Sequence, residues 1–165
     1  MKLIAILTII IGFLTIGCML ANYYKKRDRF FEDLLYFCDL LVGEISFLQH
    51  KLLNIVDSHI CSFSLQFQKV LIKYKEYLNN TISAQELTDY VGAVDLLSTE
   101  ELNDISKFLL SLGRLDSDNE LLKIKNYKNL FVKYSTLAKK DKSKYAPMFI
   151  KLGLIFGCII TIVLL

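Results

Sequence analysis

Residues 144–165 read KYAPMFIKLGLIFGCIITIVLL, a nearly unbroken apolar run that continues to the last residue. The 14 residues 152–165 correspond to roughly 21 Å of helix. Residues 148–150 nearly complete the length that a ~30 Å hydrocarbon core requires. Lys151 falls one turn inside, where its long side chain can carry the ammonium back to the headgroups. The run therefore predicts a membrane-spanning helix.

The other end of the chain carries a second run of this kind. Residues 3–24 read LIAILTIIIGFLTIGCMLANYY and contain no charged side chain, which is sufficient for a second span. We therefore predict transmembrane helices at residues 1–24 and 146–165, with one domain at residues 25–145 between them. About 120 residues are enough for a single domain with its own core.

The composition of the central region favours helices. Proline occurs once in the chain, at Pro147, and the central region has only three glycines, Gly43, Gly92 and Gly113. So few helix breakers argue against a fold of many short strands. We predict an all-α fold, an antiparallel bundle of five to six helices flanked by N- and C-terminal transmembrane helices.

Apolar stripes and helix-start signals predict five helices, at residues 28–55, 60–78, 83–95, 98–112 and 117–138, of which the first can run straight on from the membrane span and the third is short or kinked. A break within residues 57–60 or 90–96 would add a sixth helix to the bundle.

Local signals mark where the helices begin and end. SAQE (83–86) and STEE (98–101) are capping boxes, in which a serine and a glutamate satisfy the first amides of a helix. Asn79-Asn80 predicts a turn, Gly113 a left-handed helix end, and Asp116 or Ser117 the cap of the last helix.

Basic segments lie on the inner flank of each apolar run. KKRDR occupies residues 25–29 and KKDKSK occupies residues 139–144, whereas the outer ends carry only Lys2 and the amino terminus. By the positive-inside rule, this asymmetry places the central domain in the cytoplasm and both termini outside.

The alternative is a cleaved signal peptide, because TIGC (15–18) resembles a lipoprotein cleavage box. We favour the uncleaved anchor, because such boxes prefer leucine where Thr15 stands and the preceding region has a single lysine.

Nothing in the sequence indicates an enzyme. The two histidines, His50 and His59, lie near helix ends and have no partner at metal or triad spacing, which predicts surface or capping residues. The cysteines show no metal-ligand spacing and are expected to be small buried hydrophobic residues; they are Cys18, Cys38, Cys61 and Cys158. We predict no catalytic residue, no metal and no cofactor.

The charge of the central domain is polarised. The basic flanks suit anionic lipid headgroups. Nine acidic residues fall between positions 86 and 120, opposed only by Lys107 and Arg114. An acidic surface suits a basic protein partner and disfavours nucleic acid, although three helices that begin here would also collect acids. The candidate partner-binding residues are Glu86, Asp89, Glu100, Glu101 and Asp104.

Two glycines in the last span, Gly153 and Gly157, lie four residues apart and predict a flat face for close helix packing. The helix that packs there could belong to another copy of the chain, to the first span or to a different subunit.

Three segments carry a resemblance to a known family. One is LGRLD (112–116), preceded by Phe108 and followed by Glu120; another is KYAPMFIKLGLIFG (144–157) with the terminal apolar run; the third is LVGEI (41–45) after the basic flank. In this order and spacing, over nearly the whole chain, they resemble the stage III sporulation protein AB family.

The resemblance implies a protein of endospore-forming bacteria in the mother-cell membrane that faces the forespore. Its soluble domain would be similar to the cytoplasmic helical bundles of the F-type platform protein of type II secretion. The family is expected to contribute to a channel-like complex between mother cell and forespore. There it would act as a non-enzymatic platform or scaffold that couples a secretion-type ATPase to the membrane assembly. The expected partners are that ATPase, other stage III sporulation membrane proteins, the lipid membrane and further copies of the chain.

Two hypotheses from other classes remain. A helical bundle between two spans is also the plan of a two-span membrane sensor with an extracytoplasmic ligand-binding bundle, but the basic flanks predict the opposite orientation. A membrane-bound hydrolase would require a pocket in which strongly perturbed titratable groups converge.

Overall fold

The computed structural model describes residues 2–47, 52–113 and 117–164. Within these ranges every regular element is helical. The elements are α1 (Lys2–Phe47), α2 (Leu52–His59), the 3₁₀ turn η1 (Ile60–Ser62), α3 (Leu65–Leu78), α4 (Ala84–Gly92), α5 (Thr99–Ser111) and α6 (Ser117–Leu164). The predicted all-α fold is confirmed.

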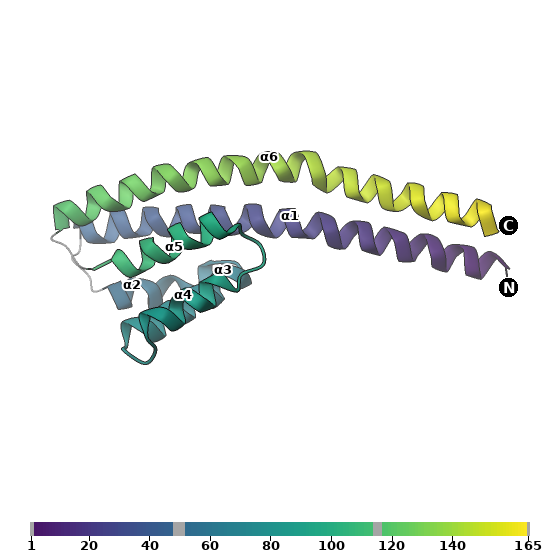
Figure 1. Cartoon of the computed structure of the whole chain (residues 1–165). Coiled ribbons are helices and arrows are strands. Elements are labelled where there is room, and N and C mark those ends of the chain that lie inside the picture. Colours follow the sequence, from purple (N-terminus) through teal and green to yellow (C-terminus); the bar gives the residue numbers. More distant parts are fainter. Residues whose placement is uncertain (1, 48–51, 114–116, 165) are drawn as a thin grey trace. The chain divides into compact units, whose positions relative to one another are not determined.

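The chain divides into two compact units (Figure 1). The hairpin unit comprises Met1–Asp28 and Thr136–Leu165, and the bundle unit comprises Arg29–Ser135. Helices α1 and α6 contribute to both units, so the first apolar run and the helix after it form one element, as predicted. The second apolar run and the helix before it likewise form one element, α6, and Pro147 lies inside this helix.

The bundle unit buries an aromatic core. Phe30, Phe37, Phe63 and Phe67 contact one another, with ring centroids 5.2 Å apart for Phe30–Phe67 and 5.1 Å apart for Phe63–Phe67. Phe108 of α5 packs on Phe131 of α6 with centroids 5.3 Å apart. All of these rings except Phe63, which is 5% exposed, are fully buried. Edge-to-face pairs of this kind add about 0.5–1.5 kcal/mol each beyond their buried area.

Both predicted capping boxes are present. The Ser83 and Ser98 hydroxyls accept the amides of Glu86 and Glu101, and each glutamate accepts the amide of its own serine. Gly113 adopts φ +75°, the predicted left-handed conformation after α5. The turn predicted at Asn79-Asn80 follows α3, with Asn80 at φ 56°.

Two predicted helices differ from those observed. Residues 60–64 do not continue the helix of residues 60–78, because Ser64 is extended and its amide donates to Asp33 Oδ2 of α1 at 2.9 Å. That cross-helix bond starts α3 at Leu65. The helix predicted at 28–55 is divided between α1 and α2, and residues 48–51 between them lie outside the described residues. The predicted caps Asp116 and His50 also lie outside the described residues.

The hairpin unit consists of the first half of α1 and the second half of α6, which lie antiparallel. Both helices are long and apolar enough to cross a membrane by length and composition. Many large apolar side chains of these two segments are exposed; they include Ile11, Met19, Leu20, Leu154, Ile155, Phe156, Ile159 and Ile162.

Candidate functional site

Glycines set the contact between α1 and α6 in the hairpin unit. A Cβ placed on Gly153 would lie 2.6 Å from the carbonyl oxygen of Phe13, and a Cβ on Gly157 would lie 3.2 Å from Cα of Ile10. From the other side, a Cβ on Gly17 would lie 2.6 Å from the carbonyl oxygen of Phe149. No side chain fits at 2.6 Å, so the two backbones are in direct contact. The segment predicted as the first span, in α1, is thus the helix against which Gly153 and Gly157 pack.

The glycines of α6 were predicted from the sequence to lie at a helix contact, whereas Gly17 was not. The signal was present, because Gly17 and Ala21 form a second pair of small residues four apart, and both are buried.

An aromatic cluster lies next to the glycine contact between α1 and α6. Tyr24 of α1 lies against Tyr145 and Phe149 of α6, with ring centroids 5.3 Å and 5.8 Å apart. The Lys144 ammonium lies 4.9 Å from the centroid of Tyr145. Tyrosines of this kind are typical of the level at which a membrane protein meets the headgroups.

Two ion pairs then connect α1 and α6. Arg27 donates from Nη1 to Asp141 Oδ2 at 2.9 Å, and Lys142 donates from Nζ to Asp28 Oδ2 at 2.6 Å. Asp28 is only 1% exposed, and its Oδ1 has no hydrogen-bond partner among the described residues. Because adjacent residues of opposite charge face each other on the two helices, these pairs fix the register of the hairpin.

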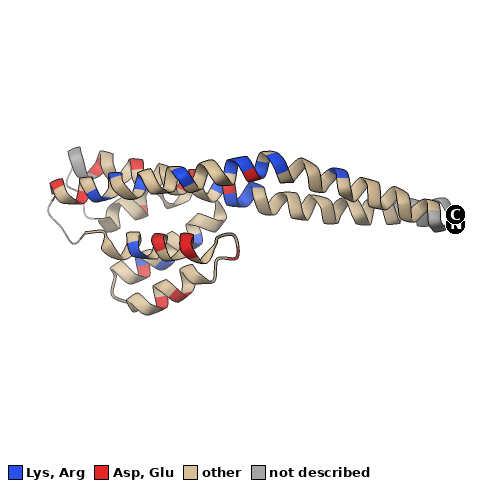
Figure 2. Ribbon diagram, turned by 45° about the horizontal axis from the view of Figure 1, so that its top comes forward, with Lys and Arg blue, Asp and Glu red and all other residues tan. Residues whose placement is uncertain are grey.

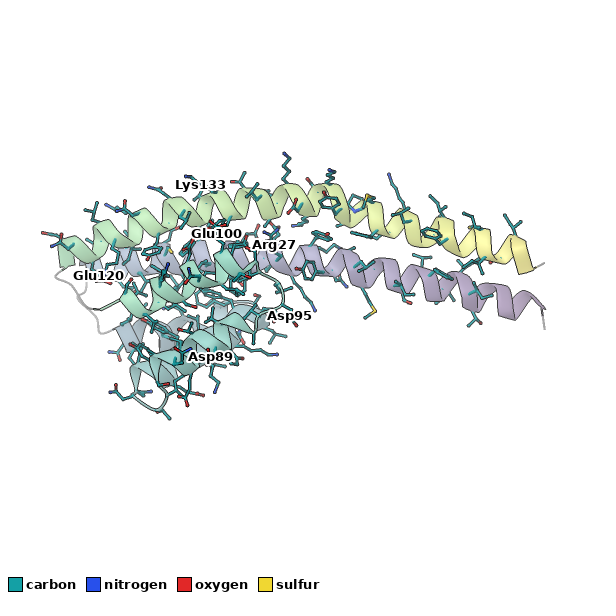
Figure 3. All side chains as sticks on the ribbon, in the orientation of Figure 1. Arg27, Asp89, Asp95, Glu100, Glu120 and Lys133 are labelled. Carbon is teal, nitrogen blue, oxygen red and sulfur yellow. The ribbon has the colours of Figure 1, made fainter. Side chains whose placement is uncertain are left out.

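Some of the candidate acidic residues of the bundle unit are exposed to solvent, whereas others are held by contacts within the fold. Figure 2 colours the ribbon red at the acidic positions of α4 and α5, and Figure 3 labels Asp89, Asp95 and Glu100. Glu86, Asp89 and Glu100 are exposed, as is Asp95 in the link between these helices. Glu86 also belongs to the capping box of α4, and Asp89 accepts a hydrogen bond from Gln85 at 2.9 Å.

The other two candidates have structural contacts. Glu101 is 3% exposed and its Oε2 accepts the Ser98 amide at 2.8 Å, so a partner has little access to it. Asp104 accepts a hydrogen bond from the Tyr134 hydroxyl of α6 at 2.7 Å. Burial of the ring, and then this bond, raise the pKa of Tyr134 above its ordinary value.

The structure agrees with the prediction for His59 but contradicts the prediction for three of the four cysteines. His59 closes α2, with its Nδ1 3.2 Å from the Ile55 carbonyl oxygen, in agreement with the predicted capping role. Cys38 is buried, whereas Cys18, Cys61 and Cys158 are exposed, so the prediction of four buried cysteines was wrong. Cys18 and Cys158 lie on the outward apolar surface of the hairpin, and Cys61 lies in η1. Among the described residues, no group of three or more metal-ligating side chains occurs.

The sequence model for stage III sporulation protein AB (spore_III_AB) matches residues 2–165. The chain belongs to the stage III sporulation protein AB family. Neither the comparison with curated proteins nor that with solved structures found a match. The family assignment confirms the resemblance drawn from the LGRLD, LVGEI and C-terminal segments, and makes the chain a sporulation protein.

Proposed function

We propose that this member of the stage III sporulation protein AB family is a non-enzymatic membrane platform. Its α1–α6 hairpin spans the mother-cell membrane that faces the forespore, and its bundle unit lies in the cytoplasm. The bundle receives a secretion-type ATPase and couples it to the other stage III membrane proteins of the complex. The observation that carries this proposal is the direct backbone contact at Gly17, Gly153 and Gly157. Seams of small residues are a means by which membrane helices associate without a hydrophobic driving force.

The exposed acids of α4, α5 and their link are the surface that we assign to the ATPase. We define this acidic surface as Glu86, Asp89, Asp95 and Glu100. Its carboxylates are solvent-accessible, and a complementary basic patch on a partner would speed association and fix its orientation. Glu101 is left out because it is buried in the cap of α5.

The test is co-purification of the ATPase with a charge-reversed chain. Asp89→Lys, Asp95→Lys and Glu100→Lys are combined, while Glu86 is kept because its carboxylate completes a cap. Membranes from sporulating cells are solubilised in detergent and the tagged chain is recovered. We expect the ATPase to be lost from the triple variant while the far-UV circular dichroism stays unchanged.

The matched control reverses three exposed acids elsewhere in the bundle unit, Glu32→Lys, Asp39→Lys and Asp57→Lys. Each of these acids takes part in a surface ion pair, which contributes about 0–1 kcal/mol, so folding should survive. The control should retain the ATPase. Equal recovery of the ATPase by the wild-type chain and the Asp89/Asp95/Glu100 variant would refute the assigned surface.

A further inference from the structure

Basic residues are concentrated where the aromatic cluster of the hairpin unit ends. Residues 25–28 and 139–145 contain seven of the 20 lysines and arginines of the chain. Only two acidic residues, Asp28 and Asp141, lie among them. Figure 2 shows this band of basic residues on both α1 and α6.

The two ion pairs divide the seven cations into two groups. Arg27 and Lys142 are held by Asp141 and Asp28 across the helix contact. The remaining five are exposed and form no ion pair with a described residue. We name this set the lysine collar; it consists of Lys25, Lys26, Lys139, Lys140 and Lys144.

The collar borders an apolar surface on one side. Exposed Met19, Leu20 and Leu152 follow it toward the ends of the chain. Tyr24 and Tyr145 lie between the two, and the Lys144 ammonium rests over the Tyr145 ring. In a membrane, cations that lie next to interfacial tyrosines and to a lipid-facing apolar surface are at the depth of the lipid phosphates. A nucleic acid or an acidic protein would have to approach the same lysines past the headgroups.

We propose that the lysine collar binds the phosphate groups of anionic phospholipids, so that the hairpin selects anionic over zwitterionic lipid. This inference rests on the proposed function in one respect, which is that the hairpin spans a membrane. Lysines of α1 and of α6 contribute to one band because the pairs Arg27–Asp141 and Asp28–Lys142 hold the two helices in register. Each lysine near an anionic surface strengthens binding about fivefold.

The experiment measures lipid binding to the full chain by native mass spectrometry. The protein, purified in a neutral detergent, is titrated with phosphatidylglycerol or with phosphatidylcholine of the same acyl chains. We expect the wild-type chain to bind phosphatidylglycerol about tenfold more tightly or better. Combining Lys25→Gln, Lys26→Gln, Lys139→Gln and Lys140→Gln should remove most of this preference.

The matched control replaces four exposed lysines of the bundle unit, Lys69→Gln, Lys107→Gln, Lys125→Gln and Lys133→Gln, and should keep the preference. Equal binding of both lipids by the wild-type chain, or an unchanged preference in the collar variant, would overturn the inference. Extraction of the chain from cell membranes by alkaline carbonate is measured in parallel. A chain released by carbonate would refute the membrane placement itself, whereas a retained chain without lipid preference would refute the collar alone.

Discussion

Gly17 and Gly153 allow α1 and α6 of the hairpin unit to touch backbone to backbone. Gly153→Ala or Gly17→Ala would place a methyl group 2.6 Å from a carbonyl oxygen of the facing helix, so the helices must separate. We expect each change to destabilise the hairpin by about 1–3 kcal/mol, the usual cost of overpacking. The lower midpoint should appear in thermal unfolding of the detergent-solubilised chain.

Gly12→Ala on the same α1 helix is the control for these variants, because nothing lies within 4 Å of a Cβ there. It shares the gain in helix propensity of a glycine-to-alanine change but adds no clash. Its midpoint should be unchanged or higher. A Gly153→Ala chain as stable as Gly12→Ala would contradict the close contact.

Cys38 and Cys61 should differ in reactivity. Burial, with a smaller effect of neighbouring Asp39, raises the pKa of Cys38 to about 12, so its reactive thiolate is scarce at neutral pH. Cys61 is exposed. In a chain with Cys18→Ser and Cys158→Ser, a maleimide at pH 7 should modify Cys61 within minutes and Cys38 only after denaturation. Mass spectrometry of the peptides distinguishes the two sites, and rapid native labelling of Cys38 would show that α1 is not packed as described.

The two ion pairs between α1 and α6 differ in the burial of their carboxylates, because Asp28 is buried and Asp141 is partly exposed. Lys142→Ala leaves the buried carboxylate of Asp28 without its cation, and because the Lys142 side chain is 41% exposed this should lower the free energy of unfolding by about 1–3 kcal/mol. Replacing both residues with leucine removes the buried charge together with its partner and should restore most of that loss. Urea unfolding followed by circular dichroism measures the difference. If the double variant were as unstable as Lys142→Ala alone, buried charge would not be the cause.

How much could be predicted differs from element to element. The boxes at Ser83 and Ser98 and the stop at Gly113 were predictable because each depends on residues within one helical turn. The start of α3 was not, because it depends on Asp33 of α1, 31 residues away from Ser64. Ile60 and Phe63 have the spacing of one face of a helix. In the structure, however, Phe63 follows η1 with an extended backbone, and its ring is buried in the core.

The same distinction between local patterns and contacts of distant residues applies to the candidate sites. The glycines of α6 were visible as a local pattern, whereas the pairing of Arg27 with Asp141 and of Asp28 with Lys142 requires the register of two segments that lie 114 residues apart. The basic flanks identified these residues as a cluster, but not which cations would be neutralised. Glu101 was named for its charge, and only the packing of α5 shows that this carboxylate is buried.

The platform proposal requires the bundle unit to lie on the cytoplasmic side of the membrane. Since α1 and α6 are antiparallel in the hairpin unit, the two points at which the chain leaves this unit, Asp28 and Thr136, lie at the same end of the hairpin. The lysines flanking both spans favour the cytoplasm. A two-span sensor would place the same bundle outside the cell.

Labelling of single cysteines by a membrane-impermeant maleimide reports on which side of the membrane each residue lies. The chain, with its four native cysteines replaced, carries Lys2→Cys or Asp95→Cys and is produced in vegetative cells, where the plasma membrane receives it. We predict that Lys2→Cys is labelled on intact cells and that Asp95→Cys is labelled only after permeabilisation. Labelling of Asp95→Cys on intact cells, with protection of Lys2→Cys, would contradict the account.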